Sequence, residues 1–553
     1  MKNTTLFILT ILLSAITSYA QVAINTDGST ANASSILHLK STSKGIIIPS
    51  MSTAQKAAIS SPANGLLIYD TDTDSFWYYN SPSAAWKEVG GATELNELSD
   101  GIYDGSSMFL GYLSGENNSG FNSNTGFGIR TLESNTSGYG NTAVGKYSLE
   151  STTTGNSNTA LGSYSINQNT SGDYNTAVGY MALYEGELGN HNTAVGNASM
   201  YSNFSGHYNT SIGSEAMYFN STGNYNTAVG YRSLNKISTG EYNTAIGNLS
   251  LKNTTSGDLN TAIGQYALLN NSTGFNNSAI GSYSLRNNTT GSNNTAMGYS
   301  ALYNGQAGLN NTAIGTSSMY TNVSGNYNTS LGSEAMYGIT TGDNNTSTGY
   351  QSMYANTIGF NNTATGNEAL WTNTGGDNNA AFGRKSLYNA TGNSNTAIGS
   401  FALYNTTSGQ YNVGIGESVD YYNQTGNNNT MIGYEAGKGY STHSKTGNIF
   451  IGYQAGMNET GSNKLYIQNS GSLLPLIGGD FDADEVYING TIKITGGTPG
   501  NGKVLTSDAS GNATWQTPAT MAAMQNIIIE MQAQIKHLKT EINILKNNNS
   551  NNK

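Results

Sequence analysis

The chain has 553 residues, of which 36% are apolar and 10% are charged, and its formal net charge is −11. No cluster of basic residues is present, which argues against a nucleic-acid partner because neutralising phosphates needs grouped Lys and Arg. The absence of cysteine excludes a disulfide framework and a cysteine-based metal site. The 37 tyrosines argue against disorder, since disordered chains carry few aromatic residues.

Residues 1–20 have the pattern of a signal peptide. Lys2 supplies a short positive region, residues 6–16 form an apolar stretch too short to span a bilayer comfortably, and residues 18–20 read small-x-small. The mature chain is therefore expected to begin at Gln21 and to be secreted, and no later apolar stretch could span a membrane as a helix. An uncleaved N-terminal anchor is the alternative.

Residues 21–92 are predicted to form a small N-terminal β module. Strand-like runs occur at 45–48, 66–69 and 76–79, and a turn-rich segment between the last two predicts a β-hairpin. Trp86 is expected on a following strand. This region resembles a module found near the N-terminus of secreted, fibre-like bacterial proteins.

The hairpin turn contains three aspartates, which raises the question of a calcium loop. An EF-hand counted from Asp70 would need Gly and Glu where the chain has Ser75 and Ser81. The turn is therefore interpreted as a solvated acidic tip, and no metal site is predicted.

A glycine recurs every 17 residues from Gly111 to Gly383, and the spacing resumes at Gly399 after the loss of one residue. A fixed period of this length predicts a solenoid, in which each repeat is one coil stacked on the last. The array is expected over residues 107–456, following a polar linker at residues 93–106.

Each coil contains a pentapeptide such as Asn141-Thr142-Ala143-Val144-Gly145, which is predicted to be a short strand. Alternation along a strand places Asn, Ala and Gly on one small face, suited to a narrow interior, and leaves Val or Ile outside. One narrow coil buries little apolar volume. The external Val/Ile column therefore predicts association with other copies of the chain.

This pentapeptide coil resembles the head repeat of trimeric autotransporter adhesins, the parallel β-roll of the YadA type. The resemblance covers residues 108–456. It implies a mainly β, left-handed β-roll in a homotrimer, with the apolar columns packed between subunits. It further implies a secreted adhesin-like protein at the cell surface or outer membrane of a Gram-negative bacterium, presenting a shaft for multivalent attachment. The alternative is a passive structural or phage-tail-fibre-like component without a ligand of its own.

The C-terminal region leaves the repeat. Residues 457–516 are predicted to form a β neck, residues 517–546 a coiled coil and residues 547–553 a disordered tail. Heptad a positions are Met521, Ile528, Ile535 and Ile542, and d positions are Met524, Met531, Leu538 and Leu545. Ile at a with Leu at d by itself favours a dimer, so the expected trimer rests on the resemblance. A single amphipathic helix packed on its own protein is the alternative.

The sequence contains no pattern for catalysis or cofactor binding. The five histidines, His38, His191, His207, His443 and His537, are scattered and share no column of the repeat. Nucleophile-elbow, zinc-protease and phosphate-loop motifs are missing from the sequence. The chain is therefore expected to be neither an enzyme nor a cofactor-binding protein.

The best candidate for a binding surface is a column of tyrosines, each five residues after a repeat glycine. Neighbouring coils lie ~4.8 Å apart, so rings in this column can stack on one another. The column could serve stacking alone, or it could contact surface glycans or host or matrix components. A threonine column in the same coils raises ice binding as a third possibility, but the strand lacks the Thr-x-Thr pair that this would favour. The tyrosines concerned are Tyr184, Tyr201, Tyr218, Tyr303, Tyr320, Tyr337, Tyr354, Tyr388 and Tyr404.

Overall fold

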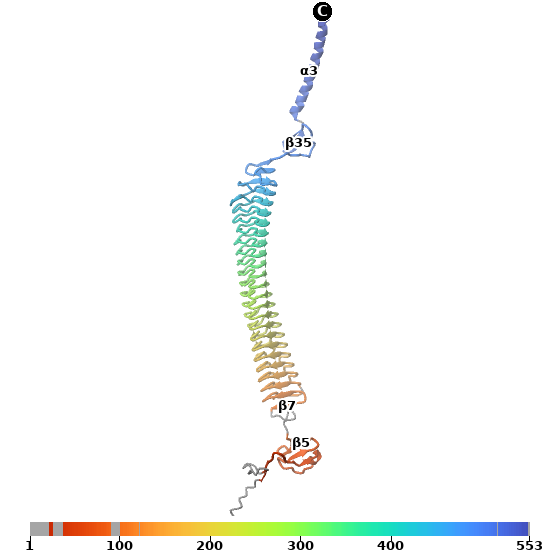
Figure 1. The fold of residues 1–553 in the computed structure, drawn as a ribbon, viewed down its shortest axis with the longest axis vertical. Coiled ribbons are helices and arrows are strands. Elements are labelled where there is room, and N and C mark those ends of the chain that lie inside the picture. The colour runs from red at the N-terminus through yellow and green to blue at the C-terminus, as the bar shows by residue number, and fades with distance from the viewer. Residues whose placement is uncertain (1–21, 26–36, 90–99, 121, 517, 551–553) are drawn as a thin grey trace, which may run out of the picture. The chain divides into compact units, whose positions relative to one another are not determined.

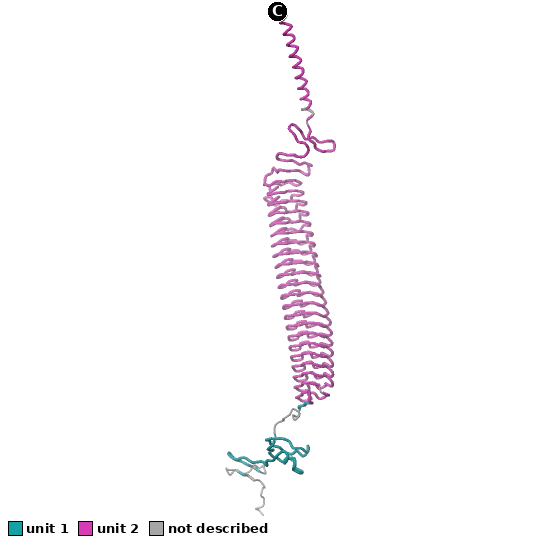
Figure 2. Tube along the Cα trace, turned by 90° about the vertical axis from the view of Figure 1, so that its right-hand side faces the viewer, with its two compact units in different colours: residues 1–103 teal, residues 104–553 magenta. Residues whose placement is uncertain are grey.

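The computed structural model describes residues 22–25, 37–89, 100–120, 122–516 and 518–550. It divides into two compact units, with the boundary between Tyr103 and Asp104 (Figure 2). The predicted signal peptide and the first half of the predicted linker, residues 93–99, lie outside the described residues.

The first unit is a small β module. A two-stranded parallel sheet is followed by a four-stranded sheet in the order β3-β4-β5-β6, and β4, β5 and β6 pair antiparallel. The predicted hairpin is therefore confirmed, and Trp86 lies on β6. The elements are β1 (Val22–Asn25), β2 (Leu37–Lys40), β3 (Ser50–Met51), α2 (Thr53–Ala57), β4 (Leu67–Asp70), β5 (Ser75–Asn80) and β6 (Ala85–Glu88).

The strand expected at residues 45–48 is wrong, because this segment has no pairing partner within the described part of the chain. Ile46 is 59% exposed and Ile47 is 93% exposed. The apolar run therefore marks a surface left open by the single chain.

The acidic turn is held by contacts within the protein. Asp70 is buried in an ion pair with Lys56 at 2.6 Å, and the Lys56 ammonium lies 3.4 Å from the centre of the Trp77 ring. Burial raises the pKa of Asp70, but hydrogen bonds from Lys56, Thr53 and the backbone outweigh it and bring the pKa to about 2. The carboxylate of Asp72 accepts the amide of Thr53. These contacts give Asp70 and Asp72 structural roles in the module.

The second unit is a parallel β-solenoid. The last strand of the first unit, β7 (Gly101–Tyr103), precedes it in the chain. Of the strands β8 to β31, all except β14 and β16 pair with their neighbours in one parallel ladder (Figure 1). The pairing is in register, so that Thr142, Ala143 and Val144 lie beside Thr159, Ala160 and Leu161.

The ladder strands are β8 (Met108–Leu110), β9 (Thr125–Phe127), β10 (Thr142–Val144), β11 (Thr159–Leu161), β12 (Thr176–Val178), β13 (Thr193–Val195), β15 (Thr210–Ile212), β17 (Thr227–Val229), β18 (Thr244–Ile246), β19 (Thr261–Ile263), β20 (Ser278–Ile280), β21 (Thr295–Met297), β22 (Thr312–Ile314), β23 (Thr329–Leu331), β24 (Thr346–Thr348), β25 (Thr363–Thr365), β26 (Ala380–Phe382), β27 (Thr396–Ile398), β28 (Val413–Ile415), β29 (Thr430–Ile432), β30 (Ile449–Ile451) and β31 (Lys464–Ile467). We number each coil from the Asn before its strand, so that Asn141 is position 1 and Gly145 is position 5.

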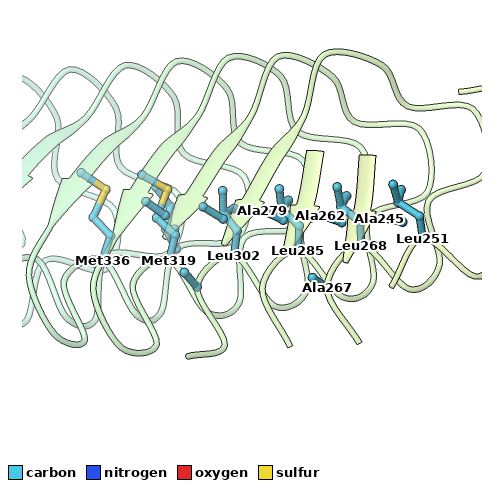
Figure 3. Packing of buried hydrophobic residues seen from close by; sticks show 14 of the residues in the cluster. Ala245, Leu251, Ala262, Ala267, Leu268, Ala279, Leu285, Leu302, Met319 and Met336 are labelled. Atoms are coloured by element: carbon cyan, nitrogen blue, oxygen red, sulfur yellow. The ribbon is translucent and has the colours of Figure 1, made fainter. Parts of the chain in front are cut away.

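The core of the solenoid is a double row of small and medium apolar side chains. Ala245 at position 3 and Leu251 at position 9 are fully buried, and their equivalents continue from coil to coil (Figure 3). The predicted small inner face is thus confirmed, and the residue at position 9, usually Leu or Met, supplies the other wall of the core.

A ladder of buried asparagines runs beside this core. Asn260 accepts a hydrogen bond from the backbone amide of Asn277 in the next coil at 3.0 Å and donates to the carbonyl of Gly274 at 2.8 Å. The same pair of bonds recurs along the array, for example at Asn141. Buried polar groups cost free energy unless paired, so this ladder explains why position 1 is Asn.

The repeat glycine is required because the next coil packs closely against its Cα. Gly264 has a φ of +136°, and a Cβ added there would lie 2.6 Å from the carbonyl oxygen of Gly281 in the next coil. Any side chain would strike backbone that the ladder holds in place. The 17-residue period is therefore set by close contact between coils.

The loss of one residue after Gly383 leaves the ladder intact. Ala380 still pairs with Thr396, and Asn395 still donates its amide to Asn379, now 16 residues away. The deletion is thus absorbed by the turns and does not interrupt the solenoid.

Phenylalanines fill the core at both ends of the array. Phe109 occupies the alanine position of the first coil, where Gly115 and Gly126 leave room for its ring. Phe450 does the same near the other end and is also fully buried. A larger side chain is accommodated where the stack of identical coils stops.

Beyond the array the chain forms two hairpins and a helix. These are β32 (Ile477–Asp480) with β33 (Glu485–Ile488), β34 (Val504–Ser507) with β35 (Ala513–Gln516), and α3 (Ala519–Ser550). The helix extends past residue 546 to Ser550, so most of the expected disordered tail is helical, because each added residue continues the backbone hydrogen bonding. Residues 517 and 551–553 lie outside the described residues, as does the side chain of Met521.

Candidate functional surfaces

The outer strand face carries an apolar column at position 4. Val144, Ile246, Ile263 and Ile398 belong to it and are between 37% and 42% exposed. Apolar side chains of this size gain free energy when they leave water, and here they form a strip along the ladder that is interrupted only at Thr348 and Thr365 among the described strands. The strip matches the column expected from the sequence, and it has no cover within the described chain.

The predicted tyrosine column exists at position 10. Consecutive rings from Tyr303 to Tyr421 lie 4.9–5.4 Å apart, centre to centre, with planes within 14° of parallel. A shorter run joins Tyr184, Tyr201 and Tyr218 at 5.1 and 4.8 Å. The structure therefore brings all nine predicted tyrosines into two stacks.

Stacking covers the faces of these rings and leaves their edges accessible. Partial burial raises the pKa of Tyr201, Tyr218, Tyr320, Tyr354, Tyr388 and Tyr421. At the start of the long stack, Arg286 donates to the Tyr303 hydroxyl at 2.8 Å. A partner would therefore meet ring edges and hydroxyls.

Two further members of the long stack were not predicted. Trp371 lies between Tyr354 and Tyr388, and Tyr421 ends the run. Both stand five residues after a repeat glycine, so the same spacing would have found them.

A second aromatic stack, at position 17, was also not predicted. Tyr174, His191, Tyr208, Tyr225 and Tyr242 lie 4.8–5.0 Å apart with planes within 5° of parallel. Their signal was a recurring aromatic residue immediately before the ladder Asn. The four tyrosines of this stack are about half exposed.

Among the described residues of the array, charged groups enter the core only near its C-terminal end. Asp420 takes the position-9 site that is Leu403 one coil earlier, and it is fully buried. Burial raises its pKa to about 6, against the attraction of Lys445 and a hydrogen bond from Asn423. The buried Lys445 ammonium donates to the carbonyls of Gly437 and Glu459 at 2.8 and 3.0 Å, and burial lowers its pKa.

His443 lies beside this buried pair. Desolvation, and then the charge of Lys445, lower the pKa of His443 to about 4. Its Nδ1 has no hydrogen-bond partner within the described residues. These three groups were not singled out from the sequence, because a two-residue lengthening of one coil brings them together.

Among the described residues, no group of three or more His, Asp or Glu side chains is arranged to hold a metal ion. In the same part of the chain, no helix combines the length and apolar character needed to cross a membrane. No shared site was predicted for the scattered histidines. His191 and His207 lie in adjacent coils, but the His191 ring stacks on Tyr208 and the His207 ring accepts the backbone amide of Asn190.

Residues 23–101 match the family model described as a phage tail like trimerisation region. No curated protein and no solved structure matches the chain significantly. The match covers the N-terminal module and ends at the first residue of β7, just before the solenoid. The chain thus joins a region similar to phage-tail trimerisation regions to a long parallel β-solenoid, a combination that suggests a structural trimeric fibre.

Proposed function

We propose that the protein is a non-catalytic homotrimeric fibre, exported to the cell surface of a Gram-negative bacterium, whose solenoid acts as an adhesin-like shaft for attachment. The observation that carries the proposal is the uncovered position-4 column, which runs along the ladder and needs a partner of the same length. A second copy of the chain has that length and period.

Apolar exposure at both ends of the chain supports the same partner. Ile24, Leu37 and Ile47 are exposed in the region similar to trimerisation regions. The heptad residues Ile535 and Leu538 are about half exposed on α3. Three copies joined at both ends and along the array would cover all of these surfaces, and the helix would hold the chains in register.

Charge placed in the position-4 column tests the assembly. The triple variant Ile246→Glu, Ile263→Glu and Ile280→Glu should lower the mass measured by light scattering below that of three chains. The control places the same charges on the same coils at exposed position 14, in Ser256→Glu, Thr273→Glu and Thr290→Glu. Equal masses for the two variants would count against an interface at this column.

Attachment is proposed to use the surfaces that such an interface leaves free. Ring edges and hydroxyls of the position-10 stack, repeated on three chains, would give weak contacts whose effect is multiplied by valency. Candidate partners are surface glycans or components of a host or matrix.

Cell- and glycan-binding assays with the tyrosines from Tyr303 to Tyr421 changed to serine test this role. Loss of binding by a variant that remains trimeric would support contact through the stack. Retained binding would leave the stack as a structural element and favour a passive fibre.

A further inference from the structure

A groove interrupts the polar surface of the array on five successive coils. Its volume is about 410 Å³, and its lining includes Gln168, Glu185, Glu187, Phe204, Phe219 and Lys236. Four coil steps separate Gln168 from Lys236, a length of about 19 Å along the ladder. The volume lies within the range of small-molecule sites in proteins.

The groove is made by local departures from the repeat at positions 11 and 13. Elsewhere position 11 is commonly Asn, as at Asn253 and Asn270, and position 13 is commonly Thr, as at Thr153 and Thr255. In the groove, position 11 is Glu185, Ser202, Phe219 and Lys236 in turn, and position 13 includes Glu187 and Phe204. Stacking of the coils does not require these residues, because the other coils stack without them.

The walls of the groove are fixed by hydrogen bonds. Two additional strands, β14 (Ser202–Asn203) and β16 (Phe219–Asn220), pair in parallel here, separately from the main ladder. Leu188 donates its amide to Phe204 at 3.1 Å, and the Asn220 amide side chain donates to Asn203 at 2.7 Å. The Ser202 hydroxyl donates to the carboxylate of Glu185. Such a site is largely formed before a ligand arrives.

The groups that face the groove are available to a ligand. Phe204 and Phe219 are 51% and 52% exposed. The Phe219 ring is braced edge-on by Tyr218 at 4.6 Å. In the described part of the chain, the side chains of Gln168, Glu187 and Lys236 make no hydrogen bond or ion pair with other residues.

We propose that this groove binds an oligosaccharide. The C–H faces of sugar rings pack on exposed aromatic rings, while amide, carboxylate and ammonium groups bond the ring hydroxyls. Two carboxylates and one ammonium give the lining a formal charge of −1, so neutral and amino sugars are favoured over uronic acids. The length of the groove fits several linked sugars. The inference rests on the attachment role proposed above and assigns it a specific site.

Titration calorimetry of the full mature chain tests the site with four tetrasaccharides: cellotetraose, chitotetraose, a chitosan tetramer and a guluronate tetramer. We expect binding of at least one of the first three and none of the guluronate tetramer. The variants Phe204→Thr and Phe219→Asn restore the residues typical of the repeat and should fold. Each should weaken binding by about tenfold or more.

Val323→Thr, a change to the same typical residue at position 13 outside the groove, is the matched control and should leave binding unchanged. The proposal is overturned if no neutral or amino tetrasaccharide binds at millimolar concentration. It is also overturned if the two phenylalanine variants bind as tightly as the parent chain. A third contradicting outcome is binding of the chitosan tetramer alone, when salt abolishes that binding and the phenylalanine variants do not change it.

The mass of the same samples separates this inference from the proposed fibre. A trimer that binds no sugar would contradict the sugar site in the groove and support the trimeric fibre. A monomer that binds sugar, and whose phenylalanine variants lose that binding, would support the sugar site and contradict the trimeric fibre.

Discussion

The regular part of the array and its C-terminal end fill the core with different kinds of side chain. Regular coils contain alanine, leucine and a paired asparagine, and no charge enters between Leu251 and Leu403. At the end, the buried Asp420 and Lys445 replace this pattern. In the regular coils, similar neighbouring coils supply the bonds of the asparagine ladder, whereas the last coils bury charged side chains of their own.

Substitution of a repeat glycine should have the largest effect on the regular part. Gly264→Ala forces a methyl group to within 2.6 Å of the Gly281 carbonyl oxygen, at a φ of +136°. We expect a loss of about 3 kcal/mol or more in unfolding free energy, since strain and a backbone clash add. Denaturant unfolding measures it. Gly471→Ala is the control, because the added Cβ there meets only side-chain atoms, none nearer than 3.4 Å; equal losses would show that close contact between coils does not set the period.

Removal of one amide from the asparagine ladder should have the next largest effect. Asn260→Ala leaves the backbone amide of Asn277 without a partner, while the Gly274 carbonyl loses one bond and keeps the one from the Asn271 side chain. One unsatisfied buried donor should cost about 1–3 kcal/mol. Asn248→Ala removes an amide side chain that has no hydrogen bond within the described residues, and it should cost little. A small loss at Asn260 in the same unfolding assay would mean that water replaces the ladder.

The C-terminal end should respond to pH in two opposing ways. The pKa of Asp420 is raised to about 6 in the folded chain, so its stabilisation is complete below pH 3.8 and lost as the pH rises through 6. The pKa of His443 is lowered to about 4, so its stabilisation is present above pH 6.5 and lost as the pH falls towards 4. Lys445 faces both groups, and burial lowers its own pKa.

Single variants should separate the two responses. Amide hydrogen exchange of the coils near Asp420, corrected for intrinsic rates, measures both responses as the pH is raised from 4 to 6. Protection should rise in Asp420→Asn, where only the His443 response remains, and fall in His443→Gln, where only the Asp420 response remains. Coils near Leu268 should show neither trend. Parallel trends in the two variants would contradict the assignment of the opposing groups.

Disruption of the tyrosine stack should have the smallest effect. Tyr320→Ser and Tyr337→Ser each remove stacked contacts at 4.9–5.2 Å. We expect about 1 kcal/mol for the coupling between them in a double-mutant cycle. A coupling near zero would show that the rings merely lie beside one another.

The features that arise from the repeat itself could be predicted from the sequence. The strand, its small inner face and the external Val/Ile column come from alternation around Asn141–Gly145, and the tyrosine stack comes from the 17-residue spacing. Contacts that depend on where coils deviate could not be predicted this way. Asp420 and Lys445 are 25 residues apart, and they interact electrostatically because one coil is two residues longer. The groove depends on the relative positions of five coils.

The proposed fibre depends above all on the outer column of the solenoid being covered by two further copies of the chain. Light scattering on residues 21–553 measures this coverage through the mass of the assembly. We expect a mass three times that of one chain, independent of concentration over a wide range. A stable monomer with an intact solenoid would contradict the proposed trimer.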